Sequence, residues 1–225
     1  MKFGGFQKTS LIDFPGRISS ILFTLGCNLR CPFCHNWRLI AEPPDSFLSD
    51  GDAIRLLESR RRYVQAVVIT GGEPTMQKDL PVFVKKIKEK GFTVKLDTNG
   101  FYPQRLERCL PYLDYVAMDV KTSCEKYKLL GPGDIGGFLQ SIEMLKEEGV
   151  DYEFRNTVVP GFVTEDDIAN MGEMVRGGKR FVFQQFVPDD TMDKSLRDAK
   201  PYSPEVIARF AETMRKYVGE VALRM

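Results

Sequence analysis

The chain has 225 residues, of which 43% are hydrophobic and 28% charged. This composition is typical of a soluble globular protein and excludes a disordered or fibrous one. The 32 basic and 31 acidic residues leave a formal charge of +1, so no global charge favours nucleic acid or an anionic membrane as partner. The longest apolar runs fall short of the roughly 18 residues that a membrane span requires, and no secretory signal is visible, so we expect a cytoplasmic protein.

Short β-branched or apolar runs alternate along the chain with segments of helical periodicity, a pattern typical of a parallel α/β fold. Six strands are predicted, at residues 20–25, 66–70, 93–97, 115–121, 152–159 and 181–187. Helices with clear start signals are predicted near Asp50, at Pro103, after Thr164 and at Pro204. We expect one domain over residues 1–225, with a core of about 18–187 and a C-terminal helix of about 203–218.

Polar and glycine-rich segments follow the first four predicted strands. In parallel sheets these segments meet at the carboxyl edge, which is where ligands bind. Periodicity alone leaves two architectures open, an open doubly wound sheet and an incomplete barrel.

Three of the five cysteines, Cys27, Cys31 and Cys34, form a CxxxCxxC motif directly after the first predicted strand. This clustering is unlike a disulfide framework and favours a metal or cluster. Three thiolates on a [4Fe–4S] cube would leave one iron open to a small molecule. A zinc site would need a fourth ligand, for which His35 is poorly placed beside Cys34. Unliganded thiols are a further alternative. Cys109 is expected to pack as a small hydrophobe, and Cys124 to have a packing or surface role.

The CxxxCxxC motif and the GGEP segment at residues 71–74 together resemble the radical S-adenosylmethionine (SAM) superfamily. Four further motifs resemble the activating enzymes of glycyl-radical enzymes: CHN at 34–36, DTNGF at 97–101, DxK at 119–121 and VPG at 159–161. Residues 8–36 are most similar to anaerobic ribonucleoside-triphosphate reductase activating proteins. The similarity covers about residues 3–187.

The resemblance implies a partial (β/α)6 TIM-like barrel with a [4Fe–4S] cluster on Cys27, Cys31 and Cys34 and SAM on the fourth iron. It implies reductive SAM cleavage and hydrogen abstraction from a glycine of a partner glycyl-radical enzyme, with anaerobic ribonucleotide reductase as the expected partner. Flavodoxin or ferredoxin is the implied electron donor.

The resemblance also implies the residues that contact SAM. Phe33 and the backbone of His35 would lie at the adenine, and Arg155 would reach SAM from the fifth strand. The remaining contacts are Gly71, Gly72, Glu73 and Pro74 near the methionyl ammonium, Asp97, Thr98 and Asn99 in the DTNG segment, and Asp119 and Lys121 near the ribose or carboxylate. A monovalent cation would be held by Asp97, Thr98, Asp119 and the carbonyl of Ala117.

One feature departs from the pyruvate formate-lyase activators, which carry a SAM-contacting histidine after the sixth strand. The only histidine here is His35, and the corresponding stretch reads FQQFVPDD, so two alternatives stay open: Gln184 or Gln185 replaces the histidine, or the contact is missing. Two other functions stay open: a radical SAM enzyme acting on a small molecule such as a pterin or deazapurine precursor, and a non-catalytic zinc-binding domain.

Overall fold

The structure is a computed structural model that describes residues 1–131 and 133–225. Pro132, in the glycine-rich segment at residues 131–137, lies outside the described residues. The chain divides into two compact units. The first unit is Met1–Asn28, Asn36–Thr98 and Tyr102–Val116, and the second unit is Leu29–His35, Asn99–Phe101 and Ala117–Met225. Each unit is described by itself.

The strands of the described residues follow one another in the sheet in chain order, from β1 to β8. Their bounds are β1 Phe3–Phe14, β2 Arg17–Thr24, β3 Ala66–Gly71, β4 Thr93–Thr98, β5 Tyr115–Asp119, β6 Asp151–Val158, β7 Arg180–Gln185 and β8 Glu220–Arg224. β1 pairs antiparallel with β2, while the pairs β2–β3, β3–β4, β6–β7 and β7–β8 are parallel. The six predicted strands correspond to β2–β7, so the prediction of a largely parallel α/β fold is confirmed.

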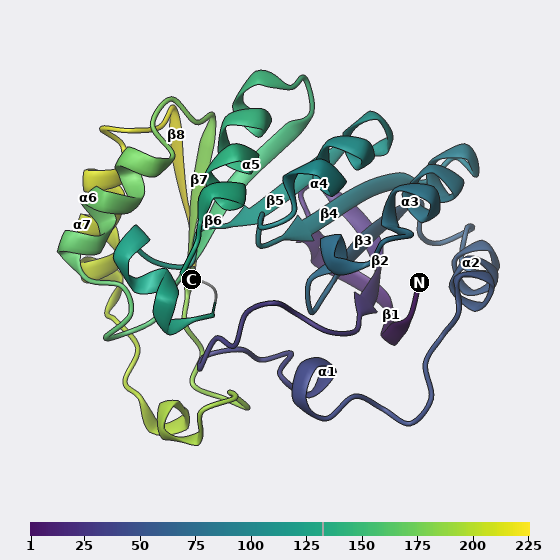
Figure 1. Ribbon diagram of the computed structural model, residues 1–225, viewed down its shortest axis with the longest axis horizontal. Coiled ribbons are helices and arrows are strands. Elements are labelled where there is room, and N and C mark those ends of the chain that lie inside the picture. The colour runs from purple at the N-terminus through teal and green to yellow at the C-terminus, as the bar shows by residue number, and fades with distance from the viewer. Residues whose placement is uncertain (132) are drawn as a thin grey trace. The chain divides into compact units, whose positions relative to one another are not determined.

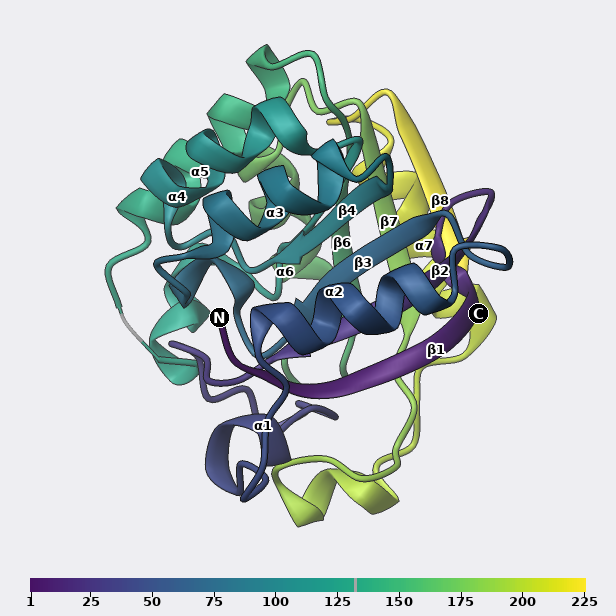
Figure 2. The same cartoon turned by 90° about the vertical axis from the view of Figure 1, so that its right-hand side faces the viewer.

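The first unit holds β1–β4 with the helices α1 (Arg38–Ala41), α2 (Asp50–Ser59), α3 (Leu80–Glu89) and α4 (Pro103–Cys109) and the 3-10 helices η1 (Pro74–Met76) and η2 (Leu110–Tyr112). Helix α2 begins at Asp50, where a helix start was predicted, with a capping box in which Ser49 and Asp52 bond each other's backbone N–H groups. Helices α2 and α3 lie on one face of β3 and β4 (Figure 2). The stripe of α3 that faces the sheet is buried, as its periodicity predicts.

The second unit holds β6–β8 with α5 (Gly136–Glu147), α6 (Glu165–Met174) and α7 (Pro204–Met214) and the 3-10 helices η3 (Cys124–Leu129) and η4 (Lys194–Asp198). Helices α6 and α7 lie side by side, and α7 packs against β7 and β8 (Figure 1). Helix α6 begins after Thr164, as predicted, and Thr164 and Asp167 form its capping box. The buried side chains of α7 recur at helical spacing and are Ile207, Phe210, Ala211 and Met214.

Two edge strands and one helix end differ from the prediction. β1 was not predicted because its register shifts and exposed Leu11 and Ile12 break the alternation of a half-buried strand. Helix α7 ends at Met214 rather than near 218, because the chain turns over residues 215–218 and then forms β8. β8 has only five residues, which are too few to show a clear alternation of apolar and polar side chains. None of the helices in the described part of the chain is long and apolar enough to span a membrane.

Candidate functional site

The first unit carries Cys27 on the loop that leaves β2. The loop is fixed by its neighbour after β3, since the backbone N–H of Glu73 donates to the carbonyl of Gly26 over 2.7 Å and that of Gly72 to the carbonyl of Thr24 over 2.9 Å. A Cβ at Gly72 would lie 1.9 Å from the carbonyl oxygen of Gly26, and one at Gly71 would lie 2.4 Å from the backbone nitrogen of Thr24. The GGEP glycines therefore allow two backbones to pack against each other beside Cys27.

Asn36 joins the same two segments from the other side of the cysteine loop. Its side-chain amide donates to the carbonyl of Gly71 over 3.2 Å. The sequence offered the CHN motif as a signal, but no role for this asparagine was predicted from it. The contact makes Asn36 a positioning residue of the loop after β3.

Glu73 organises the GGEP loop from inside. The residue is 1% exposed, and its Oε1 accepts hydrogen bonds from the backbone N–H and hydroxyl of Thr75 and, over 2.7 Å, from the hydroxyl of Thr98. Pro74, also buried, starts the 3-10 helix η1 that follows. The carboxylate thus links the segments after β3 and at the end of β4. Its predicted role as an acceptor for the SAM ammonium stays a prediction.

Asp97 and Lys95 form a buried ion pair on β4. The Lys95 Nζ lies 2.5 Å from the Asp97 Oδ1, and the two side chains are 1% and 9% exposed. The lysine was not singled out from the sequence, although a spacing of two places both side chains on one face of a strand. An aspartate predicted to bind a ligand therefore already carries a counter-charge from its own strand.

The second unit carries Cys31 and Cys34 on a loop held by backbone hydrogen bonds. The N–H of Cys34 donates to the carbonyl of Cys31 over 3.0 Å. The segment after β7 binds the same loop, because the N–H of Met192 donates to the carbonyl of Cys34 over 3.2 Å and that of Asp193 to the carbonyl of Pro32 over 2.8 Å. The segment after β7 is therefore part of the support of the cysteine loop.

The two aromatic residues beside Cys34 have defined places in the same unit. Phe33 is 8% exposed and packs edge-on against Phe162, with ring centroids 5.5 Å apart. The Nε2 atom of His35 lies 3.0 Å from the carbonyl oxygen of Val187, and the His35 ring stacks on Phe186. The side chain of His35 thus ties the cysteine loop to the end of β7.

Asp119, Lys121 and Arg155 form a charged triad at the carboxyl end of β5. The Arg155 Nε lies 2.7 Å from one Asp119 oxygen, and the Lys121 Nζ lies 3.1 Å from the other. Burial alone would raise the pKa of Asp119, but the charges of Arg155 and Lys121 and their hydrogen bonds outweigh it and hold the pKa well below its ordinary value. With one anion and two cations, the triad has a net positive charge suited to a carboxylate ligand.

Two buried residues fix this strand end, and no sequence motif marks either of them. The Asn156 amide donates to the carbonyls of Val120 and Lys121 over 2.7 and 3.1 Å. The Tyr127 hydroxyl accepts the backbone N–H of Lys121 over 3.0 Å. Asn99 has a local role, since its side-chain oxygen accepts the N–H of Phe101 over 3.2 Å in the DTNGF turn.

The other cysteines behave as predicted. Cys109 is fully buried, and burial raises the pKa of its thiol to about 12, so it is an inert packing residue. Cys124 is exposed.

The residues present fit a thiolate-bound cluster and SAM. The three motif cysteines supply thiol groups, the donors that iron–sulfur clusters take, and the loops that carry them are fixed by backbone hydrogen bonds. The triad of Asp119, Lys121 and Arg155 offers both charges to a zwitterionic ligand. Within the described residues, no three His, Cys, Asp or Glu side chains are gathered as a metal site, so the cluster ligands remain assigned by their motif.

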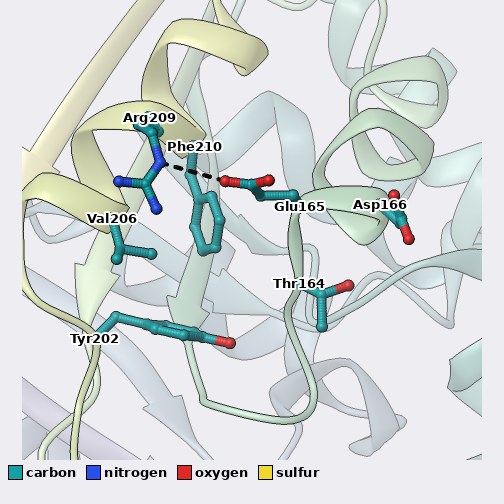
Figure 3. Close-up of a pocket in the computed structure, with 7 residues that line it drawn as sticks. All are labelled: Thr164, Glu165, Asp166, Tyr202, Val206, Arg209 and Phe210. Atoms are coloured by element: carbon teal, nitrogen blue, oxygen red, sulfur yellow. Dashed lines mark hydrogen bonds and ion pairs between the residues drawn. The ribbon is translucent and has the colours of Figure 1, made fainter.

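A cavity of about 390 Å³ opens elsewhere in the second unit, between the start of α6 and α7 (Figure 3). Across it, Arg209 lies 3.3 Å from Glu165, and Tyr202 and Phe210 form an aromatic wall. None of the predicted SAM-contacting residues lines this cavity, so it is separate from the candidate site.

Comparisons with known proteins agree with the motifs. Residues 21–175 match the family model described as Radical SAM superfamily. A Methanocaldococcus jannaschii protein named as a putative glycyl-radical enzyme activating enzyme (MJ1227) is 32% identical over 98% of this chain and 94% of its own length. The pyruvate formate-lyase 1-activating enzyme of Escherichia coli is 29% identical over 96% of both chains.

Solved structures show the same fold at low identity. A radical SAM methyltransferase from Sphaerobacter thermophilus has a TM-score of 0.74 at 19% identity, covering 96% of this chain and 68% of that one. QueE from Escherichia coli has a TM-score of 0.63 at 17% identity, covering 100% and 93%. These likenesses confirm the predicted fold class. The chain belongs to the radical SAM superfamily and, within it, to the glycyl-radical enzyme activating enzymes, a family that uses a [4Fe–4S] cluster and SAM.

Proposed function

We propose that this enzyme activates an anaerobic ribonucleotide reductase by abstracting hydrogen from a backbone glycine, leaving a glycyl radical in the partner. When bound, the cluster and SAM supply the radical that takes this hydrogen. Cys27, Cys31 and Cys34 would hold the cluster, and Asp119, Lys121 and Arg155 would orient SAM through its charged groups. Glu73 and Asn36 keep the backbone of the loop after β3 in place.

The observation that carries the choice of partner is the end of β7. Pyruvate formate-lyase activators resemble this chain but are expected to have a histidine there, where this chain has Gln184 and Gln185. The only histidine, His35, already bonds the carbonyl of Val187 in its own unit. This departure, together with the similarity of residues 8–36 to the reductase-activating branch, supports a partner other than pyruvate formate-lyase.

Two loops of the second unit are proposed as the partner surface. Leu129 is 59% exposed at the end of η3, and Val187 is 54% exposed directly after β7. Large apolar side chains exposed beside a site often mark contacts with another protein. Backbone N–H groups of the loop after β7 also donate to the carbonyls of Pro32 and Cys34. A partner bound at this loop would therefore contact the segment that holds the cysteine loop in place.

The test is an anaerobic incubation of the reconstituted, reduced enzyme with SAM and either purified anaerobic ribonucleotide reductase or pyruvate formate-lyase. Electron paramagnetic resonance should show a protein-based doublet with the reductase and not with the lyase. A doublet only with the lyase would overturn the choice of partner. No doublet with any glycyl-radical candidate, together with turnover of a small molecule, would overturn glycine activation as a whole.

Matched variants separate partner docking from chemistry. Leu129→Ser and Val187→Ser should raise the KM for the partner while SAM cleavage without partner stays unchanged. Val82→Ser, at a side chain 52% exposed on α3, is the control. An unchanged KM in both loop variants would remove these loops from the interface.

Reduced flavodoxin or ferredoxin, proposed as electron donors, should support the reaction in place of a chemical reductant.

A further inference from the structure

Lys95 is a charged side chain in an otherwise apolar position. On β4 it lies in register with Val68 of β3, which in turn lies in register with Ile21 of β2. Register partners in parallel strands share a face of the sheet, so the lysine stem lies in an apolar row. Val68 and Ile21 belong to one buried hydrophobic cluster. An ammonium in such surroundings is costly unless it is paired, and Asp97 supplies the pair at 2.5 Å.

Asp97 is also one of the residues that the family resemblance assigns to a monovalent cation. The other expected ligands were Thr98, Asp119 and the carbonyl of Ala117. In the structure the Asp97 carboxylate forms an ion pair with the Lys95 ammonium, and the Thr98 hydroxyl donates a hydrogen bond to Glu73. In the second unit, Asp119 has Lys121 and Arg155 on its two oxygens.

The residues therefore do not fit the expected cation. Both carboxylates already carry positive charge from side chains of this chain, and a potassium or sodium ion at Asp97 would lie beside the Lys95 ammonium, which is bonded to Oδ1. Two cations on one buried carboxylate repel each other, and displacing the ammonium instead would leave Lys95 charged and buried without Asp97, which is strongly unfavourable.

We propose that Lys95 is a built-in counter-cation, a positioning residue that holds Asp97 in place of a free monovalent cation. SAM binding by this enzyme is then independent of potassium and sodium. The inference concerns SAM binding alone and does not depend on which protein the enzyme activates.

The test measures SAM affinity of the reconstituted, unreduced enzyme by equilibrium dialysis, in about 0.15 M potassium chloride and in the same concentration of choline chloride. For the natural chain, the two dissociation constants should agree within about twofold. For Lys95→Met, which leaves Asp97 without its ammonium, affinity in choline should be about tenfold lower than in potassium. A Tm measured in both salts should show the same pattern, higher in potassium only for the variant.

The controls address folding and charge. Lys85→Met removes an exposed lysine of α3 and should change neither affinity nor salt response. Lys95→Met combined with Asp97→Asn removes both buried charges and should recover the Tm lost in Lys95→Met, which shows that the loss comes from the Asp97 charge that Lys95 no longer balances.

Two results would overturn the proposal. The first is a natural enzyme whose SAM affinity falls about tenfold when choline replaces potassium. The second is a Lys95→Met variant that binds SAM normally in both salts. If Lys95→Met does not fold, the comparison of the natural enzyme in the two salts still decides.

Discussion

Thr98 donates its hydroxyl hydrogen to Oε1 of Glu73 over 2.7 Å, and this bond joins the end of β4 to the loop after β3. The same oxygen accepts two further hydrogen bonds from Thr75. One buried carboxylate thus holds together two motifs, DTNG and GGEP, that lie 25 residues apart in the chain.

Replacing Glu73 by alanine removes the acceptor of three buried hydrogen bonds. We expect Glu73→Ala to lower the free energy of unfolding by about 2–3 kcal/mol, since the donors of Thr75 and Thr98 lose their partner. Urea denaturation of the cluster-free protein at neutral pH measures this effect. Glu107→Ala, at an exposed position of α4, is the control and should change stability by less than about 0.5 kcal/mol. Equal stabilities of the two variants would show that Glu73 is not a structural anchor.

Gly72→Ala tests the close packing beside Cys27. A Cβ there would lie 1.9 Å from the carbonyl oxygen of Gly26, so the two loops must separate. We expect a loss of about 1–3 kcal/mol in stability and a lower iron content after reconstitution. Gly51→Ala is the matched control, because the nearest atom to its Cβ is a side-chain nitrogen of Arg55 at 3.5 Å. Normal iron content with weaker SAM binding in Gly72→Ala would instead favour the role first predicted, close approach of the methionyl ammonium.

The parallel strands and the helix starts were predictable from the sequence because each depends on neighbouring residues. The capping pairs Ser49–Asp52 and Thr164–Asp167 lie three residues apart, and strands such as β3 and β5 contain short runs of buried apolar residues. β1 and β8 were not predictable in the same way. Their formation depends on pairing with β2 and β7, and their own patterns are irregular or short.

The residues of the candidate site also differ in whether neighbouring or distant parts of the chain determine their roles. Motif spacing predicts the cysteines and the pair Asp119 and Lys121 as site residues. The positioning contacts of Asn36, Asn156 and Lys95 join the site to distant residues or depend on burial, neither of which a motif encodes. The sequence alone also does not show why the GGEP segment needs glycine for packing. The backbone against which Gly72 packs lies 46 residues earlier in the chain, at Gly26.

Single alanine variants of Cys27, Cys31 and Cys34 test the cluster ligands. Each should abolish acid-labile sulfide and most of the bound iron after anaerobic reconstitution, because a cluster held by two thiolates is not retained. Cys109→Ala should keep the full iron content and lose about 1 kcal/mol of stability, since it removes only a buried sulfur atom. A Cys31→Ala variant with normal iron and sulfide would contradict the assignment, and zinc without sulfide in the natural chain would contradict the cluster itself.

Asp119→Asn should have a pH-dependent effect on stability. The folded-state pKa of Asp119 lies below its unfolded value of about 3.9, so the carboxylate stabilises the fold fully above that value and less as the pH falls toward the folded pKa. We expect a loss of about 1–3 kcal/mol at pH 7, where Arg155 and Lys121 lose their counter-charge, and a smaller loss at about pH 3. Urea denaturation at both pH values gives the two differences. Asp198→Asn, at an exposed position, is the control and should lower stability at neither pH. If the stability loss of Asp119→Asn does not shrink in acid, the ion pairs are not its cause.

The two glutamines at the end of β7 can be told apart by their faces of the sheet. Gln184 lies in register with Thr157, which shares a face of β6 with Arg155. Gln185 lies on the opposite face, where its amide contacts the carbonyl of Tyr202 over 3.3 Å. If a glutamine replaces the missing histidine, it is therefore Gln184. We expect Gln184→Ala to weaken SAM binding about tenfold and Gln185→Ala to leave it within about twofold while lowering the Tm. Equilibrium dialysis with SAM measures the first effect and thermal denaturation the second, and the reverse ranking would place the SAM contact on the other face of β7.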